Sequence, residues 1–155
     1  MTGTELLTGE LERLGIEYEL LGHDPTNRAV DEATSLGLRP DEIAKTIVVT
    51  TGAENLRVLL PASERVDIHK LRDVLSAGKE LHLLTEEALG SDYPEFELGA
   101  VPPFGGRDDG VILDRRLAAL EELVFEAGTH DHSARVKAAD LVELAGARVE
   151  DICMN

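Results

Sequence analysis

The sequence predicts a single α+β domain, residues 1–155, in which helices surround a mixed and largely antiparallel sheet. Three observations indicate this fold class. The length of 155 residues fits one domain, and 43% apolar residues suffice to bury a core. Helical and strand patterns alternate irregularly, with hairpins as well as crossovers, which disfavours a doubly wound parallel sheet. No internal repeat, low-complexity tract or long linker divides the chain.

The first half of the chain predicts two helices, a helical turn and three strands. Leu7, Leu11 and Leu14 recur at helical spacing within residues 4–14, and Gly15 suits the C-terminal cap of that helix. The elements that follow are a strand at 16–21, a turn at 22–27, a helix at 29–36 closed by Gly37, a helical turn at 40–44 opened by Pro40, and strands at 46–51 and 56–60. The last two strands form a predicted hairpin, because only the glycine-containing segment 52–55 separates them.

The second half predicts shorter elements in a less regular order. They are a helix from Asp67 to Leu75 with Gly78 beyond it, a strand at 80–84, a helical turn from Thr85 to about Gly90, strands at 111–113 and 123–127, a loop at 128–133, a strand near 134–136, and a helix at 138–145 closed by Gly146. Asp67 has the side chain of a good N-terminal cap. The three phenylalanines and two tyrosines are the only aromatic residues, so the predicted core is aliphatic.

The charge of the chain limits its partners. It has 31 acidic and 15 basic residues and a formal net charge of −16. Nucleic acids are bound mainly through Lys and Arg, so we expect no DNA partner, and any RNA contact must be local or helped by another protein. We expect a cytoplasmic protein without membrane contact, because we find no secretory leader and no apolar stretch of membrane-spanning length. The single cysteine, Cys153, predicts an incidental free thiol at a mobile terminus.

Lys45 is the most informative residue of the sequence. It is one of four lysines and lies in the apolar run 43–49, which predicts a buried strand and its entry. Burial disfavours a charged ammonium, so such a lysine needs partners or a function, and its reactivity changes. It could also extend its ammonium to solvent or pair with one of the many carboxylates.

The segment 99–106, Gly-Ala-Val-Pro-Pro-Phe-Gly-Gly, predicts a rigid binding loop. Two prolines fix the backbone and three glycines allow tight turns and close approach to a ligand. An ordinary surface turn is the alternative. A stiff apolar centre flanked by glycines is unusual for such a turn, which favours the binding loop.

Two further segments carry histidines. His130 and His132 flank Asp131 in the loop 128–133, which favours a loop that offers hydroxyl and imidazole groups to a substrate over a metal site, because no third ligand is set by local spacing. Solvated loop histidines are the alternative, and they are the commonest case. His23 precedes Asp24 and Thr26, which can cap the next helix. No Ser-His-Asp triad, phosphate-binding loop or dinucleotide-binding motif can be argued.

Taken in order, these motifs resemble the YbaK/ProX family of aminoacyl-tRNA editing domains, which also occur inserted in bacterial prolyl-tRNA synthetases. The resemblance covers nearly the whole chain. It rests on the segments His23-Asp24-Pro25, Leu36-Gly37-Leu38, Pro40-Asp41-Glu42, Lys45-Thr46 before the strand 47–49, 99–105, Ile112-Leu113-Asp114, Ala127-Gly128 and Ala139-Asp140-Leu141. It implies a YbaK-like fold with a barrel-like sheet, and metal-independent hydrolysis of the ester between a wrong amino acid and a tRNA, with no cofactor.

The resemblance also implies roles for individual residues. Lys45 would be the key polar side chain of the pocket, and Gly99 would offer backbone groups near the scissile ester. Thr46 would line the pocket and help to choose the substrate. The other substrate-binding candidates come from the two loops and the first turn, and they are Val101, Pro102, Gly128, Thr129, His130 and His23.

The sequence departs from the family pattern at three places. Cysteine-specific members carry a tyrosine near the segment 20–22 and a serine near Glu126-Ala127, and alanine-specific members tend to have asparagine where Thr46 stands. The substrate therefore stays open among the Cys, Ala and Ser class. Because the acidic surface predicts weak binding to the 3′ end of aminoacyl-tRNA, a synthetase or elongation factor could present the substrate. Two alternatives stay open: a non-catalytic binding module for a small ligand or protein partner, and an enzyme with Lys45 as Schiff-base nucleophile.

Overall fold

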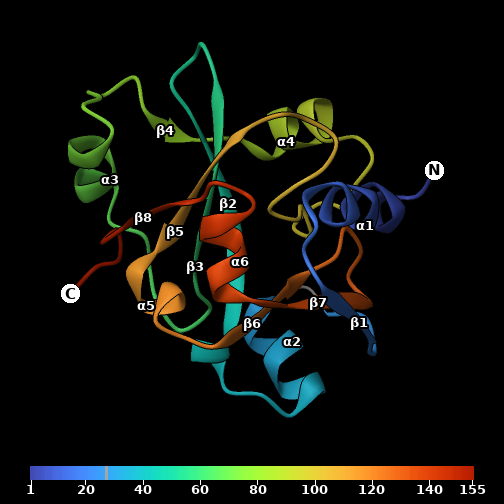
Figure 1. The fold of residues 1–155 in the computed structure, drawn as a ribbon. Helices are drawn as coiled ribbons and strands as arrows, with labels where there is room; N and C mark the ends of the chain where they lie inside the picture. Colours follow the sequence, from blue (N-terminus) through green and yellow to red (C-terminus); the bar gives the residue numbers. More distant parts are fainter. Residues whose placement is uncertain (27) are drawn as a thin grey trace.

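The computed structural model describes residues 1–26 and 28–155, so only Asn27 of the predicted turn 22–27 lies outside the described residues. The elements in chain order are α1 (Gly3–Leu14), β1 (Tyr18–Gly22), α2 (Ala29–Leu36), the 3-10 turn η1 (Pro40–Glu42), β2 (Ile43–Thr50), β3 (Asn55–Pro61), α3 (Ile68–Val74), β4 (His82–Leu83), α4 (Glu86–Asp92), β5 (Gly110–Asp114), α5 (Arg115–Ala118), β6 (Glu122–Glu126), β7 (His132–Lys137), α6 (Ala138–Glu143) and β8 (Arg148–Glu150). Figure 1 shows them as one body with the helices around a central sheet. The predicted mixed α/β class is confirmed.

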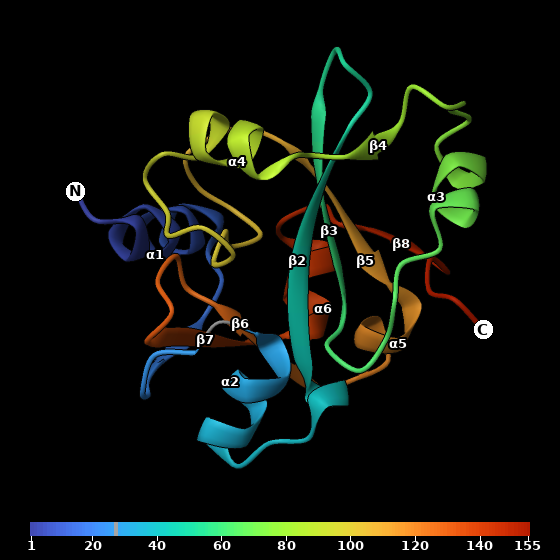
Figure 2. The same cartoon turned by 180° about the vertical axis from the view of Figure 1, so that it is seen from behind.

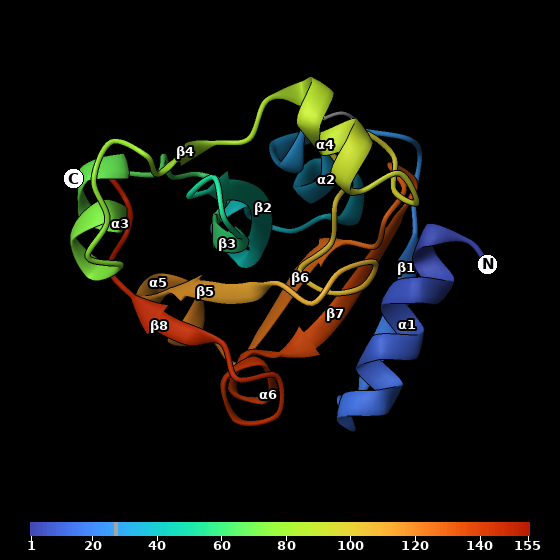
Figure 3. The ribbon, with the colours of Figure 1, turned by 90° about the horizontal axis from the view of Figure 1, so that it is seen from above.

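The sheet is mixed, and β2 is at its centre. Its order is β1-β7-β6-β2-β3-β5-β8, with β4 paired to β2 off this path. The pairs β1–β7, β6–β7, β2–β3 and β2–β4 are antiparallel, whereas β2–β6, β3–β5 and β5–β8 are parallel. The predicted hairpin of β2 and β3 is confirmed, with Lys45 opposite Leu60 in its register. Seen from above, the sheet curves strongly, and β6, β7 and β1 turn away from β3, β5 and β8 (Figure 3).

Local sequence signals account for most helix ends. Gly15 and Gly37 end α1 and α2 at φ 76° and 70°, the left-handed conformation that glycine adopts without strain. Asp67 caps α3 by accepting hydrogen bonds from two backbone N–H groups, and Thr85 caps α4. The predicted cap of α2 by Asp24 or Thr26 is wrong, because Arg28 holds that position and makes no side-chain cap.

The core is aliphatic, as predicted, and it is divided by the sheet. The largest cluster joins α1, α5 and α6 to the sheet, with Leu7, Leu11, Leu113, Phe125 and Leu141 all fully buried. A second cluster lies under α3 and includes Cys153, which pairs with Val66 in an isolated β-bridge. The expectation of a mobile terminal thiol is therefore wrong.

The elements around β2 position the candidate site. From behind, α2 lies beside the lower part of β2, and the segment after α4 descends along the same side (Figure 2). A third apolar cluster fixes α2 through Ala33, which packs with Ile43 of β2 and Val124 of β6. Among the described residues, no helix has the length and apolar character needed to cross a bilayer.

Candidate active site

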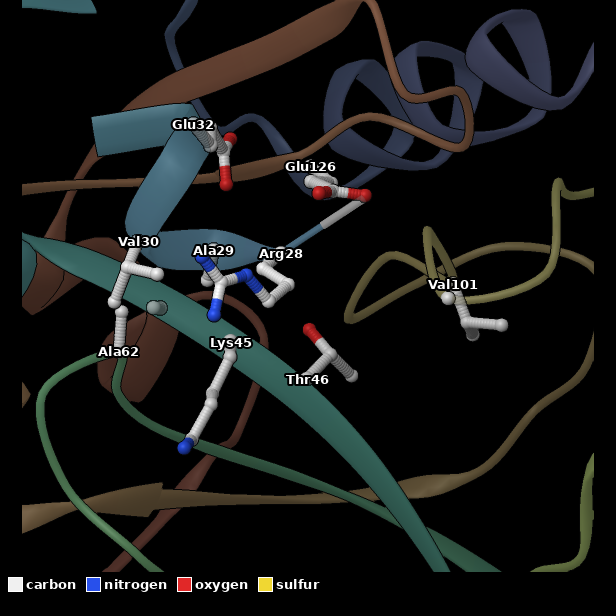
Figure 4. Close-up of a pocket in the computed structure, with 11 residues that line it drawn as sticks. Arg28, Ala29, Val30, Glu32, Lys45, Thr46, Ala62, Val101 and Glu126 are labelled. Atoms are coloured by element: carbon white, nitrogen blue, oxygen red, sulfur yellow. The ribbon is translucent and has the colours of Figure 1, made fainter. Parts of the chain in front are cut away.

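A cavity of about 330 Å³ opens where β2, α2, the turn before residue 101 and the end of β6 meet. Its lining residues are Arg28, Ala29, Val30, Glu32, Ala44, Lys45, Thr46, Ala62, Gly99, Val101 and Glu126. Figure 4 shows nine of these side chains around the strand β2. Four predicted site residues, Lys45, Thr46, Gly99 and Val101, are thus brought together although they lie up to 56 positions apart in the sequence.

Lys45 and Thr46 reach the cavity from opposite faces of β2, because successive strand residues point to opposite sides. The hydroxyl of Thr46 points to the side of Glu32 and Glu126, whereas the side chain of Lys45 extends away from both (Figure 4). Lys45 is half-buried, and this burial lowers its pKa, opposed by the charge of Glu64. Its ammonium makes no hydrogen bond or ion pair with any residue that the structure describes.

Gly99 is the third residue of a tight turn at the cavity wall. The turn runs from Glu97 to Ala100 and closes with the bond from the Ala100 N–H to the Glu97 carbonyl, at 2.9 Å. Gly99 has φ 85°, and a Cβ there would lie 3.4 Å from Cε1 of His130. The positive φ favours glycine at this position, because it strains other residues, whereas the distance to His130 is an ordinary van der Waals contact.

His130 is fixed against this turn by three hydrogen bonds between the two loops. The Glu97 N–H donates to the Gly128 carbonyl at 3.0 Å, and the His130 N–H donates to the Glu97 carboxylate at 2.9 Å. Nε2 of the His130 ring lies 2.7 Å from the carbonyl oxygen of Leu98, which requires a proton on Nε2. The other ring nitrogen, Nδ1, then faces the carboxyl group of Glu126 at 3.5 Å.

Arg57 holds the rest of the segment 99–106 in place. Its side chain is 0% exposed and lies in β3, where it pairs with Asp109 at 3.1 Å. The guanidinium also donates to the carbonyl oxygens of Pro102, at 2.9 Å, and Gly105. Tyr93 stacks on the guanidinium at 4.8 Å and donates its hydroxyl to Asp109 at 2.6 Å. The predicted rigid loop owes its shape to this buried arginine as well as to its prolines.

Two buried carboxyl groups form the inner wall of the cavity. Glu32 of α2 is 0% exposed, and Glu126 at the end of β6 is 9% exposed. Burial raises the pKa of Glu126 to about 8, helped by the charges of Glu32 and Glu97. Burial also raises the pKa of Glu32 to about 7, opposed by the hydrogen bond from Ser133.

His23 supports Glu32 and does not line the cavity. Nε2 of His23 lies 2.9 Å from the hydroxyl of Ser133, and that hydroxyl donates to Glu32. The fully buried Ser133 stands between histidine and carboxylate, so the three do not have the arrangement of a catalytic triad, in which the histidine is central. The three residues instead join the first turn, α2 and β7.

The other predicted site residues of the two loops lie beside the cavity. They are not among the described residues that line it. Pro102 offers its carbonyl to Arg57, and Gly128 is buried at φ 89° against α1. The hydroxyl of Thr129 donates to Asp131 at 2.8 Å and lies 3.1 Å from Nδ1 of His132. The described residues include no cluster of three or more His, Cys, Asp or Glu side chains suited to a metal.

A second, apolar cavity of about 190 Å³ adjoins the first. Both share Thr46, Gly99 and Val101, and the second adds Ile47, Val48 and three leucines, Leu83, Leu84 and Leu89. The site therefore combines a cavity that contains two carboxyl groups with a more apolar cavity that shares Gly99 with it. Such an arrangement suits a ligand with a small polar end and a larger flat or apolar part.

Comparisons with known proteins identify the family and the fold. A family model described as "Aminoacyl-tRNA editing domain" matches residues 23–144. A protein described as a "putative trans-editing enzyme for prolyl tRNA synthetase" superposes with a TM-score of 0.88 at 23% identity, covering 100% of this chain and 99% of its own. A hypothetical protein superposes with a TM-score of 0.88 at 23% identity, covering 97% of this chain and 100% of its own.

A larger protein contains the same fold. It is described as a "Putative signal transduction protein" from Marinobacter aquaeolei, and it superposes with a TM-score of 0.70 at 17% identity, covering 96% of this chain but 31% of its own. At these identities the superpositions confirm the fold, and the family match covers the part of the chain that builds the cavity.

Proposed function

Because the chain belongs to the aminoacyl-tRNA editing domain family, we propose that it acts in trans as an aminoacyl-tRNA deacylase. Its substrate is the ester of a tRNA mischarged with a small amino acid of the Cys, Ala or Ser class. The observation that carries the proposal is the cavity in which Thr46, Gly99 and Val101 meet an unpaired, half-buried lysine. The reaction is the hydrolysis of a carboxylic ester.

The size of the cavity supports a small aminoacyl group. At about 330 Å³ it lies at the low end of the range for ligand sites, roughly 300–1,000 Å³. Thr46 and Val101 line both this cavity and the adjoining apolar cavity. Exclusion by size rejects bulky residues, whereas a single methylene discriminates by only about 1–3 kcal/mol.

The geometry separates the roles of Lys45 and Gly99. The Lys45 ammonium extends away from the carboxyl groups (Figure 4), so we assign it to the terminal ribose or phosphate of the tRNA at the mouth of the cavity. The turn at Gly99 brings backbone groups to the cavity wall, where they can face the scissile ester. One donor fixed toward a developing oxyanion contributes about 2.7–4 kcal/mol in known enzymes, and an aminoacyl ester is already activated. Water or a substrate hydroxyl is the attacking group, and no protein nucleophile is required.

The charge of the protein bears on its partners. A net charge of −16 opposes the tRNA backbone, so we propose that a synthetase or elongation factor presents the aminoacyl end in the cytoplasm. DNA and membranes are not part of this proposal. No step requires a metal or cofactor.

A deacylation panel tests the function. tRNAs charged with Ala, Cys, Ser, Thr or Pro are incubated with the wild type, with Lys45→Ala, and with Lys79→Ala as a matched control at an exposed lysine. We expect hydrolysis of one ester by the wild type and Lys79→Ala, and at least a tenfold loss in folded Lys45→Ala. No hydrolysis by the folded wild type, alone or with a synthetase, refutes the deacylase and leaves the binding module. Borohydride trapping of a carbonyl compound on Lys45 would support the Schiff-base enzyme instead.

A further inference from the structure

The two carboxyl groups of the inner wall each have an oxygen without a partner. Oε1 of Glu32 and Oε2 of Glu126 are fully shielded from solvent and accept no hydrogen bond from the described residues. Both side chains line the cavity, and both are at least nine-tenths buried. Buried polar groups are nearly always hydrogen-bonded, so two unpaired acceptors in one cavity point to a donor that the ligand brings.

The protein supplies little to compensate these acceptors. Glu32 receives one hydrogen bond from Ser133 on its other oxygen. Glu126 faces Nδ1 of His130 at 3.5 Å, a contact that does not meet hydrogen-bond geometry. Nδ1 has no hydrogen-bond partner among the described residues. Arg28 lines the same cavity but pairs with Asp31 at 3.0 Å. The inner wall is therefore acidic, and a cation with several N–H donors complements it.

We propose that Glu126 and Glu32 form a subsite for the α-ammonium group of the aminoacyl ester. This subsite rests on the proposed function. It would let the site recognise the α-ammonium group in addition to the size of the amino-acid side chain. Every aminoacyl ester carries this cation beside its carbonyl carbon, and an ammonium has three N–H donors for the two free oxygens. The subsite selects esters with a free α-amine and rejects those in which the amine is blocked or replaced.

The position of the subsite fits the rest of the cavity. Glu126 contacts His130, and His130 packs on Gly99, so an ammonium held by Glu126 places the neighbouring carbonyl carbon toward the turn at Gly99. Lys45 extends to the opposite side, where the anionic tRNA backbone would continue (Figure 4). The aminoacyl end of a tRNA has the matching polarity, with a cation at its tip and phosphates behind it.

Binding of non-hydrolysable amides tests the subsite without relying on catalysis. The two ligands are the alanyl and the lactyl amides of 3′-amino-3′-deoxyadenosine, which differ only in an α-ammonium or an α-hydroxyl group. By calorimetry we expect the wild type to bind the alanyl amide roughly 10- to 100-fold more tightly, the effect of one charge-assisted hydrogen bond. Because the pKa of Glu126 is about 8, alanyl binding at pH 7 should also release a proton, visible as a dependence of the heat on the buffer.

Matched variants test which carboxyl groups cause the preference for the alanyl amide. In Glu126→Gln and Glu32→Gln the preference for the alanyl amide should fall at least tenfold, whereas Glu122→Gln, an exposed glutamate on the same strand, should keep it. Equal binding of the two amides to the wild type overturns the subsite, as does binding of neither at millimolar concentration. The wild-type comparison decides the question even where a variant fails to fold.

The corresponding tRNA esters distinguish this inference from the proposed function. Selective binding of the alanyl amide without hydrolysis of any aminoacyl-tRNA would refute the deacylase and keep the subsite. Hydrolysis that is insensitive to Glu126→Gln, together with equal binding of both amides, would refute the subsite and keep the deacylase.

Discussion

Replacement of Glu126 by glutamine should change how the stability of the protein depends on pH. Glu126 is 9% exposed, and burial together with Glu32 and Glu97 raises its pKa from 4.5 to about 8. Between these two values the folded protein binds more protons at this site than the unfolded chain does. Stability contributed by Glu126 is therefore fully present below pH 4.5 and is lost as the pH rises to about 8.

The magnitude follows from the same interval. A group that is protonated in the folded protein but ionised in the unfolded chain changes the free energy of unfolding by about 1.36 kcal/mol per pH unit. Between pH 5 and pH 8 the wild type therefore loses at most about 4 kcal/mol of stability through Glu126. Solvent relaxation around a carboxyl group beside an open cavity reduces this figure, and we expect about 2 kcal/mol to remain. Glutamine does not titrate, so the stability of Glu126→Gln relative to the wild type should rise by that amount from pH 5 to pH 8.

Urea denaturation of the two proteins at half-unit steps from pH 5 to pH 8.5 measures this difference. The comparison removes the contributions of carboxylates that do not interact with Glu126, because these are common to both proteins. Glu122→Gln serves as the control and should run parallel to the wild type. A difference that stays constant within about 0.5 kcal/mol over this range would show that Glu126 is ionised in the folded protein at an ordinary pKa, and the reasoning would be wrong.

Three further predictions concern the loop and the thiol. Arg57→Met should lower the free energy of unfolding by about 3–5 kcal/mol in urea denaturation, because it removes the buried guanidinium that pairs with the Asp109 carboxylate, whose side chain is 5% exposed. Recovery of stability in Arg57→Met/Asp109→Asn supports this reason, and a loss under about 1 kcal/mol contradicts it. Gly99→Ala should lose about 1–2 kcal/mol of stability and most of the deacylation activity. The control Gly52→Ala changes a glycine with φ 91° and no neighbour within 4 Å, so it should lose similar stability and keep the activity. Cys153 is buried and has its pKa raised to about 12, so a thiol reagent at pH 8 should label it only on unfolding, and rapid labelling of the native protein would refute this burial.

The fold was predictable where a local signal decides an element. The hairpin of β2 and β3 and the glycine caps of α1 and α2 follow from short patterns, because turn geometry and positive φ depend on neighbouring residues. The four-residue α5 and the three-residue β8 were not predicted. An element shorter than a helical turn and a half has no periodicity to detect, and β8 exists as a strand because β5 pairs with it.

The candidate site was predictable only in part. A long cation in an apolar run identified Lys45, and the same signal is present at Arg57, which interrupts the run 56–60 and proves to be fully buried. Glu126 directly follows the apolar run 123–125, so it carries a similar signal with the opposite charge. Glu32 carries none, because a glutamate in the first turn of a helix is an ordinary surface residue. The side chain that donates a hydrogen bond to it, Ser133, lies 101 positions away in the sequence.

The acidic composition of the protein limits where its affinity for the proposed substrate can come from. A protein with a net charge of −16 gains little from long-range attraction to tRNA, so its affinity for an aminoacyl end has to come from contacts within the cavity. Two buried carboxyl groups, each with one oxygen that has no hydrogen-bond partner among the described residues, can supply this contact, because an ammonium that enters replaces the missing hydrogen bonds. In the proposed complex the same groups would repel phosphate, and the tRNA backbone would lie on the side to which Lys45 extends (Figure 4). Recognition then depends on the aminoacyl group, which is the part of the substrate that an editing enzyme must inspect.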